Sequence, residues 1–267
     1  SLAPRDPAPG GWLTGDGKLS LGAVKLFQDG SIQGYTGYLS NPYHKLLDAG
    51  LPGQWRGYAI HTRAALAELI TGYHKKGWQV AVHAYEQAQK ALPDVNRRHI
   101  IIHCQTARED QLDRIRRLGV VPSFFVVHTY YWGDRHHEIF LGPDRAGRIN
   151  PLRSALERRI PFTNHNDSAV TPMDPLLSVW SAVNRRTASG RVLGEEQTIP
   201  VLEALRSVTT WGARQFHEER LKGSLEPGKL ADMTILAENP LAVAPRRLRD
   251  ISVVGVLVGN ELMFGEC

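Results

Sequence analysis

Short apolar runs alternate with segments of helical spacing along much of the chain. A short run of apolar or β-branched residues that stops at a turn signal is typical of a buried strand. Asp29-Gly30-Ser31 supplies such a signal after the first run, and Gly119 precedes the fourth. We therefore predict five buried strands, at residues 23–27, 78–84, 99–103, 120–127 and 160–163.

Helical periodicity fills the stretches between these runs. Thr62 has an N-cap side chain, and apolar residues follow it at helical spacing. Residues 109–118 show the same pattern and end at Gly119, which suits a helix C-terminus. Further helices are predicted at residues 152–157, with Asn150 as N-cap and Pro151 in the first turn, and from residues 174 and 198 onward. A long polar connection is predicted that holds residues 128–137 and ends at Asn150-Pro151.

Strands that alternate with helices indicate a parallel sheet with right-handed crossovers. Five such units are fewer than a closed barrel contains, and a complete barrel by itself needs about 250 residues. The pattern changes in the last part of the chain. Residues 233–236 are predicted to be a strand, and residues 251–258 and 261–264 a hairpin around Gly259-Asn260. The sequence thus predicts an α/β fold followed by a small β element.

Three of the five predicted strands end in polar side chains that can bind a metal or move a proton. The segments are VAVHA at His83, IIIHC at His103, and FTNHND at His165 and Asp167. The carboxyl ends of parallel strands meet at one rim of the sheet, where active sites of α/β folds lie. Two histidines from neighbouring strands suit Zn, Fe or Mn, and Asp167 suits a general base or an extra ligand. For each histidine alone, a hydrogen-bonded structural role is the alternative.

Lys25 and His128 are further candidates. Lys25 lies within an apolar strand pattern, where burial of an ammonium is costly unless it is paired, deprotonated or modified. This favours a functional lysine, with a solvent-facing position as the alternative. His128 follows an apolar run where the next strand opens onto the rim, so it is a candidate for substrate contact or for a hydrogen-bonded loop residue. The adjacent His136-His137-Glu138 is interpreted as solvated.

Composition narrows the function classes. The 267 residues are 42% hydrophobic and 22% charged, which is ordinary for a globular protein. The net charge of +5 comes mainly from arginine pairs near predicted helix ends, such as Arg116-Arg117, so we expect no nucleic-acid partner. Two cysteines, Cys104 and Cys267, exclude a disulfide framework and a Cys-rich zinc site. No leader or long apolar run is present, so we expect no membrane span and a cytoplasmic location.

Five sequence blocks occur in one order: VKLFQDGS, VHAYEQA, IIHCQTAREDQL, NHNDSAVTPMDP and GSLEPGKLADMTIL. This order resembles the YtcJ-like branch of the amidohydrolase superfamily, amidohydrolase family 3, from Gly22 onward. The resemblance implies the C-terminal portion of a metal-dependent-hydrolase (β/α)8 (TIM) barrel with a small β-sandwich tail. It divides the chain into an irregular lead-in at residues 1–17, a partial barrel with strands 4–8 at 18–220, and β-sandwich strands at 221–267.

The resemblance also implies roles for single residues. Lys25 matches the fourth-strand lysine, which in such enzymes can be carboxylated and bridge two metals. His83 and His103 match the fifth- and sixth-strand metal ligands, and Asp167 matches the eighth-strand catalytic carboxylate. The implied activity is hydrolysis of a small-molecule amide, formamide or cyclic amide by a metal-activated water, with one or two divalent metals, usually zinc. The remaining candidates for substrate binding are His128 and His165.

The HxH motif of the family's first barrel strand is absent, because no His-any-His triplet occurs in the sequence. The residues before Lys25 are too few for three β/α units. We therefore expect this chain to correspond to the C-terminal part of the family chain, and to form a homo-oligomer because open sheet edges pair readily. Two alternatives remain open: a barrel lyase with Lys25 as a Schiff-base lysine, and a non-catalytic half-barrel that acts as a binding or assembly module.

Overall fold

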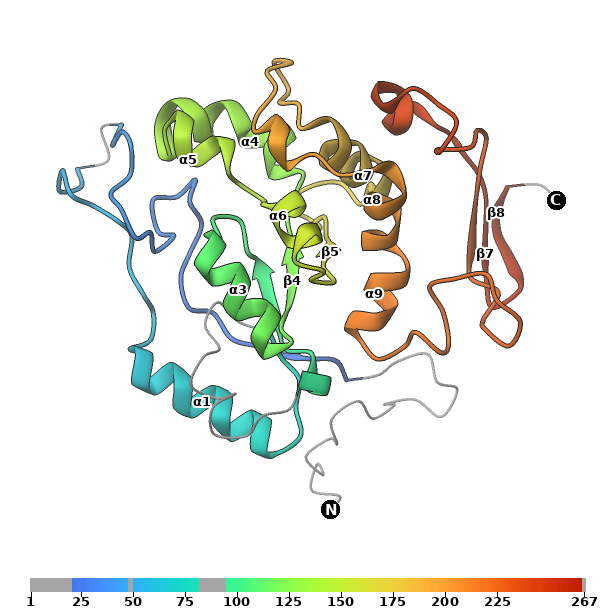
Figure 1. Ribbon diagram of the computed structural model, residues 1–267, viewed down its shortest axis with the longest axis horizontal. Coiled ribbons are helices and arrows are strands. Elements are labelled where there is room, and N and C mark those ends of the chain that lie inside the picture. Colours follow the sequence, from blue (N-terminus) through green and yellow to red (C-terminus); the bar gives the residue numbers. More distant parts are fainter. Residues whose placement is uncertain (1–20, 48–49, 82–94, 266–267) are drawn as a thin grey trace.

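A computed structural model describes residues 21–47, 50–81 and 95–265 of the chain. These residues contain a parallel sheet whose five strands follow one another in chain order (Figure 1). All five predicted strands are confirmed, although the last begins at the end of its predicted run. The strands are β1 (Val24–Lys25), β2 (Val80–Ala81), β3 (Ile100–His103), β4 (Val121–Phe124) and β5 (Thr163–Asn164).

Helices accompany the strands as the periodicity predicts. In α1 the Thr62 hydroxyl accepts the backbone N–H of Ala65 at 3.2 Å, so the predicted N-cap is confirmed. α3 has the predicted bounds and ends at Gly119 in the left-handed region, with φ 63°. The helices up to the last strand of the sheet are α1 (Arg63–Lys75), the 3-10 turn η1 (Val95–Arg97), α3 (Glu109–Leu118), α4 (His128–Arg135), the π-helix η2 (His136–Phe140), α5 (Pro143–Gly147) and α6 (Leu152–Glu157).

The segment predicted to be a long polar connection is helical instead, as α4, η2 and α5. The prediction was wrong because it counted histidines as polar positions. His128, His136 and Phe140 recur at helical spacing and are all buried. The start of α6 also differs from the prediction: Pro151 is its N-cap, while Asn150 has φ 50° and a buried side chain.

Further helices follow β5. Asp174 caps α7 as expected, and its carboxylate accepts the backbone N–H of Leu177 at 2.9 Å. The elements are α7 (Pro175–Asn184), the 3-10 turn η3 (Glu195–Gln197), α8 (Val201–Val208) and α9 (Thr210–Gln215). Together with the sheet they enclose the main hydrophobic core, where Phe162 packs edge-on against Phe124 and Trp211 at 5.6 and 4.9 Å between ring centroids.

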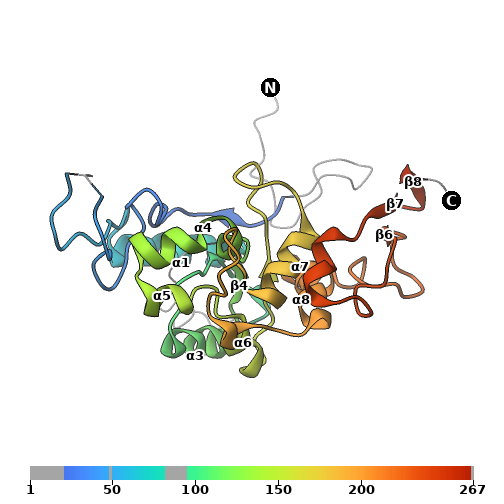
Figure 2. The same ribbon diagram turned by 90° about the horizontal axis from the view of Figure 1, so that it is seen from above.

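A second hydrophobic cluster packs the segment after β1 against η2 and α5. Tyr43 and Phe140 are both buried there, together with Ile149 and Leu193. The backbone N–H of His44 donates to the Phe140 carbonyl at 3.0 Å. This long segment therefore lies beside α5, at the carboxyl end of the sheet (Figures 1 and 2).

The last part of the chain forms an antiparallel three-stranded sheet, and the predicted strand and hairpin are confirmed. Its strands are β6 (Met233–Leu236), β7 (Val253–Val258) and β8 (Glu261–Gly265). Between β6 and β7, the 3-10 helix η4 (Pro245–Asp250) packs on α7, and the Trp180 indole N–H donates to the Arg246 carbonyl at 2.9 Å. Leu248 and Ile251 join the main core, so this segment is anchored to the larger unit.

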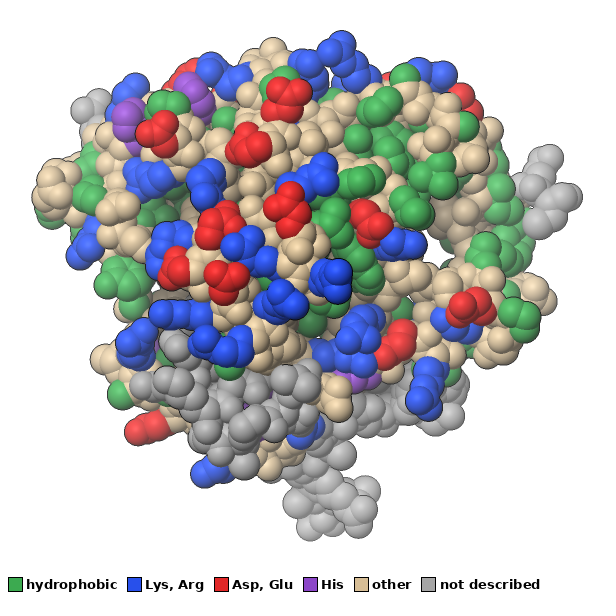
Figure 3. All heavy atoms as spheres, in the orientation of Figure 1, with side chains coloured by type: hydrophobic (Ala, Val, Ile, Leu, Met, Phe, Trp, Pro, Cys, Tyr) green, Lys and Arg blue, Asp and Glu red, His purple; other side chains and the backbone are tan. Residues whose placement is uncertain are grey.

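Charges of both signs are interspersed on the face shown in Figure 3. Over α3 and α6, Glu109 pairs with Arg148 at 2.6 Å and with Arg158 at 2.8 Å. Arg158 also reaches Asp113 at 2.8 Å. Arginines near these helix ends are thus engaged with carboxylates. Within the described residues, no helix combines the length and the apolar character that a membrane span needs.

Candidate functional site

The carboxyl ends of β3, β4 and β5 bring the site together. In the sheet register His103 pairs with Phe124, which in turn pairs with Asn164. His165 follows at once, and its backbone N–H donates to the Phe124 carbonyl at 3.0 Å. His103 and Asp167 have φ values of 63° and 48°, in the left-handed region that residues with side chains seldom adopt. The chain therefore turns sharply at the rim, where these side chains stand.

His103, His165 and Asp167 form one cluster at this rim. His103 Nδ1 lies 3.1 Å from His165 Nε2, and His103 Nε2 lies 3.9 Å from Asp167 Oδ2. One ligand atom from each residue lies within 4.8 Å of those of the other two. Imidazole nitrogen and carboxylate oxygen are common ligands of zinc and related divalent cations. The structure thus brings together three of the residues that the sequence singled out, in a spacing that suits a shared cation.

The two other predicted ligands are placed differently. His83 lies outside the described residues. Lys25 ends β1, and its Nζ lies 4.8 Å from the ring centroid of Phe27 in a cation–π contact. The expectation of a buried ammonium is wrong, because side chains alternate along the strand and Lys25 takes the exposed position. Lys25 also borders the cavity described below, and its role as a metal ligand stays a prediction.

A row of buried polar side chains lies behind His165. Its Nδ1 is 2.9 Å from Ser123 Oγ, and Ser123 Oγ is 2.9 Å from Thr163 Oγ1. Thr163 Oγ1 is in turn 2.7 Å from the side-chain oxygen of Gln215. The sequence patterns did not single out Ser123, Thr163 or Gln215. The available signal was Ser123, a lone hydroxyl within the apolar run VVPSFFVV.

His128 belongs to a second hydrogen-bonded group. Its Nδ1 lies 2.8 Å from Gln105 Oε1, and Gln105 Nε2 lies 3.0 Å from His136 Nε2. Because an amide oxygen only accepts hydrogen bonds, His128 Nδ1 carries the proton, and in the neutral ring Nε2 keeps its lone pair. That Nε2 lies 3.5 Å from Gln33 Nε2. The interpretation of His136 as a solvated loop residue is wrong, since His136 is fully buried.

Burial keeps these imidazoles uncharged at neutral pH. Burial, together with electrostatic interactions with His103 and Lys25, lowers the pKa of His165 to about 3. Burial lowers the pKa of His136 to about 4. The pKa of His128 falls well below its usual value, first through burial and then because protonation of His128 would be opposed by protonation of the neighbouring histidines. Neutral rings offer lone pairs, which both a metal and a substrate N–H require.

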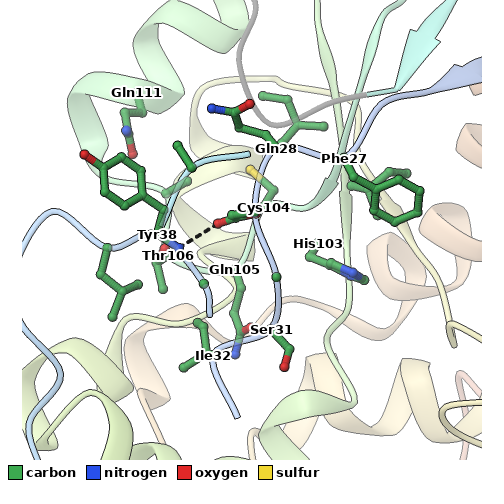
Figure 4. A pocket seen from close by; sticks show the side chains of 18 of the residues that line it. Phe27, Gln28, Ser31, Ile32, Tyr38, His103, Cys104, Gln105, Thr106 and Gln111 are labelled. Carbon is green, nitrogen blue, oxygen red and sulfur yellow. Dashed lines mark hydrogen bonds between the residues drawn. The ribbon is translucent and has the colours of Figure 1, made fainter. Parts of the chain in front are cut away.

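These side chains border a cavity of about 1380 Å³. Its lining includes four of the predicted site residues: Lys25, His103, His128 and Asp167. Figure 4 shows side chains of the segment after β1, Phe27, Gln28, Ser31 and Ile32, close to those at the end of β3 and just after it, His103, Cys104 and Gln105. Burial raises the pKa of the Cys104 thiol to about 12, so this cysteine is neither a thiolate nucleophile nor a ready metal ligand.

The chain is similar to several known proteins. The sequence model of the amidohydrolase family matches residues 5–264. The putative amidohydrolase YtcJ of Bacillus subtilis (strain 168) is 28% identical over 262 residues, which cover 92% of this chain and 47% of that protein. The N-substituted formamide deformylase of Arthrobacter pascens is 28% identical over 163 residues, which cover 61% of this chain and 30% of that protein.

A solved structure extends the comparison to the fold. The crystal structure of an uncharacterized metal-dependent hydrolase from Pyrococcus horikoshii OT3 matches with a TM-score of 0.71 and 28% identity. The match covers 85% of this chain and 47% of that one. The chain therefore spans less than half the length of each of these three relatives, while most of its own length matches the fold of the Pyrococcus protein.

Proposed function

Because this chain belongs to the amidohydrolase family, we propose that it carries the catalytic rim of a metal-dependent hydrolase that cleaves carbon–nitrogen bonds of small molecules. In this proposal the sheet supplies strands 4–8 of a (β/α)8 barrel, and the strands β6 to β8 belong to a β-sandwich. The observation that carries it is the cluster of His103, His165 and Asp167 at the carboxyl ends of parallel strands.

The donor set at this rim fits a divalent cation. His103 Nε2 and Asp167 Oδ2 face each other at 3.9 Å, which is too far for a hydrogen bond between them. We propose zinc as the metal, with His103 and Asp167 as ligands from the described residues, and His83 and Lys25, in its carboxylated form, as further ligands. When bound, the cation supplies Lewis acidity toward a carbonyl and makes water a better acid.

Asp167 is the residue that moves the proton. Its side chain is 33% exposed and borders the cavity, so that water and substrate can both reach its carboxylate. Water oxygen adds to the carbonyl carbon, Asp167 takes the proton released, and the proton passes to the nitrogen as the carbon–nitrogen bond breaks. The products are a carboxylic acid and an amine.

His128 is proposed to orient the substrate. Its ring is neutral, its Nδ1–H donates to Gln105, and its Nε2 lone pair has only a long contact of 3.5 Å with the Gln33 amide nitrogen, which a substrate N–H can replace. The Gln33 amide, 3.5 Å away, lies beside that nitrogen and can bond the substrate carbonyl. A secondary amide presents both groups. The formamide deformylase among the relatives makes N-substituted formamides the first class to assay.

The test is hydrolysis of a panel of N-substituted formamides, amides and cyclic amides by the purified protein, with release of the amine as the readout. We expect activity that a chelator removes and zinc restores, together with bound zinc by elemental analysis. Asp167→Asn should lower kcat by at least about 100-fold, since proton transfer typically contributes about 10²–10⁴-fold. Asp144→Asn is the matched control, because Asp144 is an exposed carboxylate in α5.

The proposal fails if the zinc-loaded protein hydrolyses nothing in the panel, or if both aspartate variants retain the activity of the unmodified protein. The Schiff-base alternative predicts a different result, namely a borohydride-trapped substrate adduct on Lys25 without any metal requirement. The exposed position of Lys25 does not supply the desolvated surroundings that such a lysine needs.

A further inference from the structure

We propose that Gln105, itself held by His136, fixes His128 as a hydrogen-bond acceptor, and that the site thereby selects amides with an N–H over N,N-disubstituted amides. The inference deepens the proposed function, on which it rests for its substrate class. The position of the proton on the His128 ring rests only on contacts among side chains of α4, η2 and the segments after β1 and β3.

Gln105 holds the ring of His128 from the protein side. Gln105 Oε1 lies 2.8 Å from His128 Nδ1. An amide oxygen only accepts hydrogen bonds, so the N–H in this contact is that of the ring. His128 is 8% exposed and Gln105 is 7% exposed, so water hardly competes for the bond. The neutral ring has one N–H, and its Nε2 is therefore an acceptor.

The Gln105 amide is in turn fixed at its other end. Its Nε2 lies 3.0 Å from His136 Nε2, and an amide nitrogen only donates, so the His136 nitrogen accepts. The proton of the His136 ring then lies on Nδ1, which has no partner among the described residues. The backbone holds Gln105 as well, because its carbonyl accepts the N–H of Asn150 at 2.7 Å. Gln105 and His136 therefore act through His128 and are positioning residues.

A second amide faces the other nitrogen of His128. Gln33, in the segment after β1, places its Nε2 3.5 Å from His128 Nε2. This amide donor suits an acceptor at the ring nitrogen and opposes an N–H there. Phe125 and Trp132 pack against the ring, at 4.1 and 4.9 Å between centroids, and hold its plane. His128 and Gln33 both border the cavity, so the acceptor lies where a substrate can reach it.

A secondary amide is the substrate that such an acceptor fits. Its N–H can donate to His128 Nε2 in place of the long contact with Gln33. An N,N-disubstituted amide has an alkyl group at that position and leaves the buried lone pair without a donor. Sites built to hydrogen-bond a substrate group discriminate against analogues that lack this group. For one hydrogen bond to a neutral ring we expect a selectivity of roughly 10- to 100-fold in kcat/KM.

The first experiment locates the ring protons directly. Protein labelled with ¹⁵N in its histidine rings is studied at pH 7.5 by long-range ¹H–¹⁵N correlation, with signals assigned from His128→Asn and His136→Asn. We expect a protonated Nδ1 and an unprotonated Nε2 in both rings. A proton on Nε2 of His128 would mean that Gln105 turns its nitrogen toward this ring, and it overturns the proposal.

The second experiment uses the same signals to follow substrate binding. In Asp167→Asn, which is expected to slow turnover, N-butylformamide should shift the Nε2 resonance of His128 because its N–H donates to that nitrogen. N-butyl-N-methylformamide, which has no N–H, should leave the resonance in place. Equal shifts with both formamides, or with neither, contradict the selectivity. The measurement needs no hydrolysis, so the proposed hydrolase can fail while this result stands.

The third experiment compares the hydrolysis of the two formamides by the zinc-loaded protein. kcat/KM should be roughly 10- to 100-fold higher for N-butylformamide. Gln105→Met keeps the length of the side chain without its amide, and its two kcat/KM values should become similar. Gln111→Met is the matched control, because Gln111 also borders the cavity but its Oε1 accepts the backbone N–H of Arg108 at 2.9 Å. This control should keep the selectivity of the unmodified protein.

A conservative pair of variants tests His136. His136→Gln can offer an oxygen to the Gln105 amide and should keep the selectivity, whereas His136→Phe fills the space without an acceptor and should lower it. Circular dichroism of each variant confirms that it is folded. Equal selectivity in the unmodified protein, Gln105→Met and Gln111→Met contradicts the role of Gln105. Equal selectivity in the two His136 variants contradicts the role of His136.

Discussion

Replacement of Arg185 by methionine tests how a buried cation supports the rim. Arg185 is fully buried and donates to the carbonyls of Leu193 at 3.0 Å, Asn150 at 3.1 Å and Ile149 at 2.7 Å. Burial lowers the pKa of its guanidinium to about 10, so it remains charged at neutral pH. The backbone N–H of Asn150 donates to the Gln105 carbonyl at 2.7 Å. Arg185 therefore supports the residue whose amide holds the two buried histidines.

The expected loss of stability follows from the three carbonyls that accept hydrogen bonds from Arg185. Methionine has a similar length but no donor. In the variant the Asn150 carbonyl still accepts the backbone N–H of Leu152 at 2.8 Å. The carbonyls of Leu193 and Ile149 lose the hydrogen bonds that Arg185 donates to them. Each buried carbonyl without a partner costs about 1–3 kcal/mol, and removal of a buried charge offsets part of that cost. We therefore expect the free energy of unfolding of Arg185→Met to be lower by about 2–5 kcal/mol. At about 2–4 °C per kcal/mol for a protein of this size, Tm should fall by roughly 5–15 °C.

The assay is thermal and urea unfolding followed by circular dichroism. Arg186→Met is the matched control, since the Arg186 side chain donates to the Gly190 carbonyl at 2.7 Å on an exposed turn. Surface changes of this kind usually cost less than about 0.5 kcal/mol. Equal stability losses in Arg185→Met and Arg186→Met would refute the reasoning, because they would show that the buried bonds contribute no more than exposed ones.

Three further predictions concern pH, the substrate and the backbone. The pKa of Glu219 is lowered to about 2, chiefly by the side-chain hydrogen bond from Arg98. Ionised Glu219 therefore stabilises the folded protein fully above the unfolded-state pKa of about 4.3, and this contribution is lost as pH falls toward about 2. Because solvent partly screens the Glu219–Arg98 pair, the contribution is no more than about 1 kcal/mol. Urea unfolding from pH 6 to 2 should show this slope in the unmodified protein and lose it in Glu219→Gln. His128→Ala should lower kcat/KM for a formamide by about 10- to 100-fold, and His128→Asn should recover part of it; equal rates in all three proteins would contradict substrate contact. Gly194→Ala should lower Tm more than Gly190→Ala, because both have positive φ but only at Gly194 would a Cβ overlap a neighbouring carbonyl.

Much of the candidate site could be predicted because it depends on strand direction. His103 and Asp167 were found as polar residues just after apolar runs, and parallel strands bring such ends to one rim whatever the details of packing. Helix ends could also be predicted where a capping residue stands directly beside the helix in the sequence, as Thr62 and Gly119 do. The helix at residues 128–135 was missed, because its buried residues, His128, Thr129 and Gly133, include no large apolar side chain.

The sequence by itself determined the alternation of strands and helices, the antiparallel tail and the family, since each depends on local order along the chain. Only the tertiary structure decided that Lys25 faces solvent and that His165 stands between Ser123 and His103. These contacts join residues 42 and 62 positions apart. Contacts between side chains this far apart in the sequence depend on how the strands pack against one another, and no spacing along the chain records that.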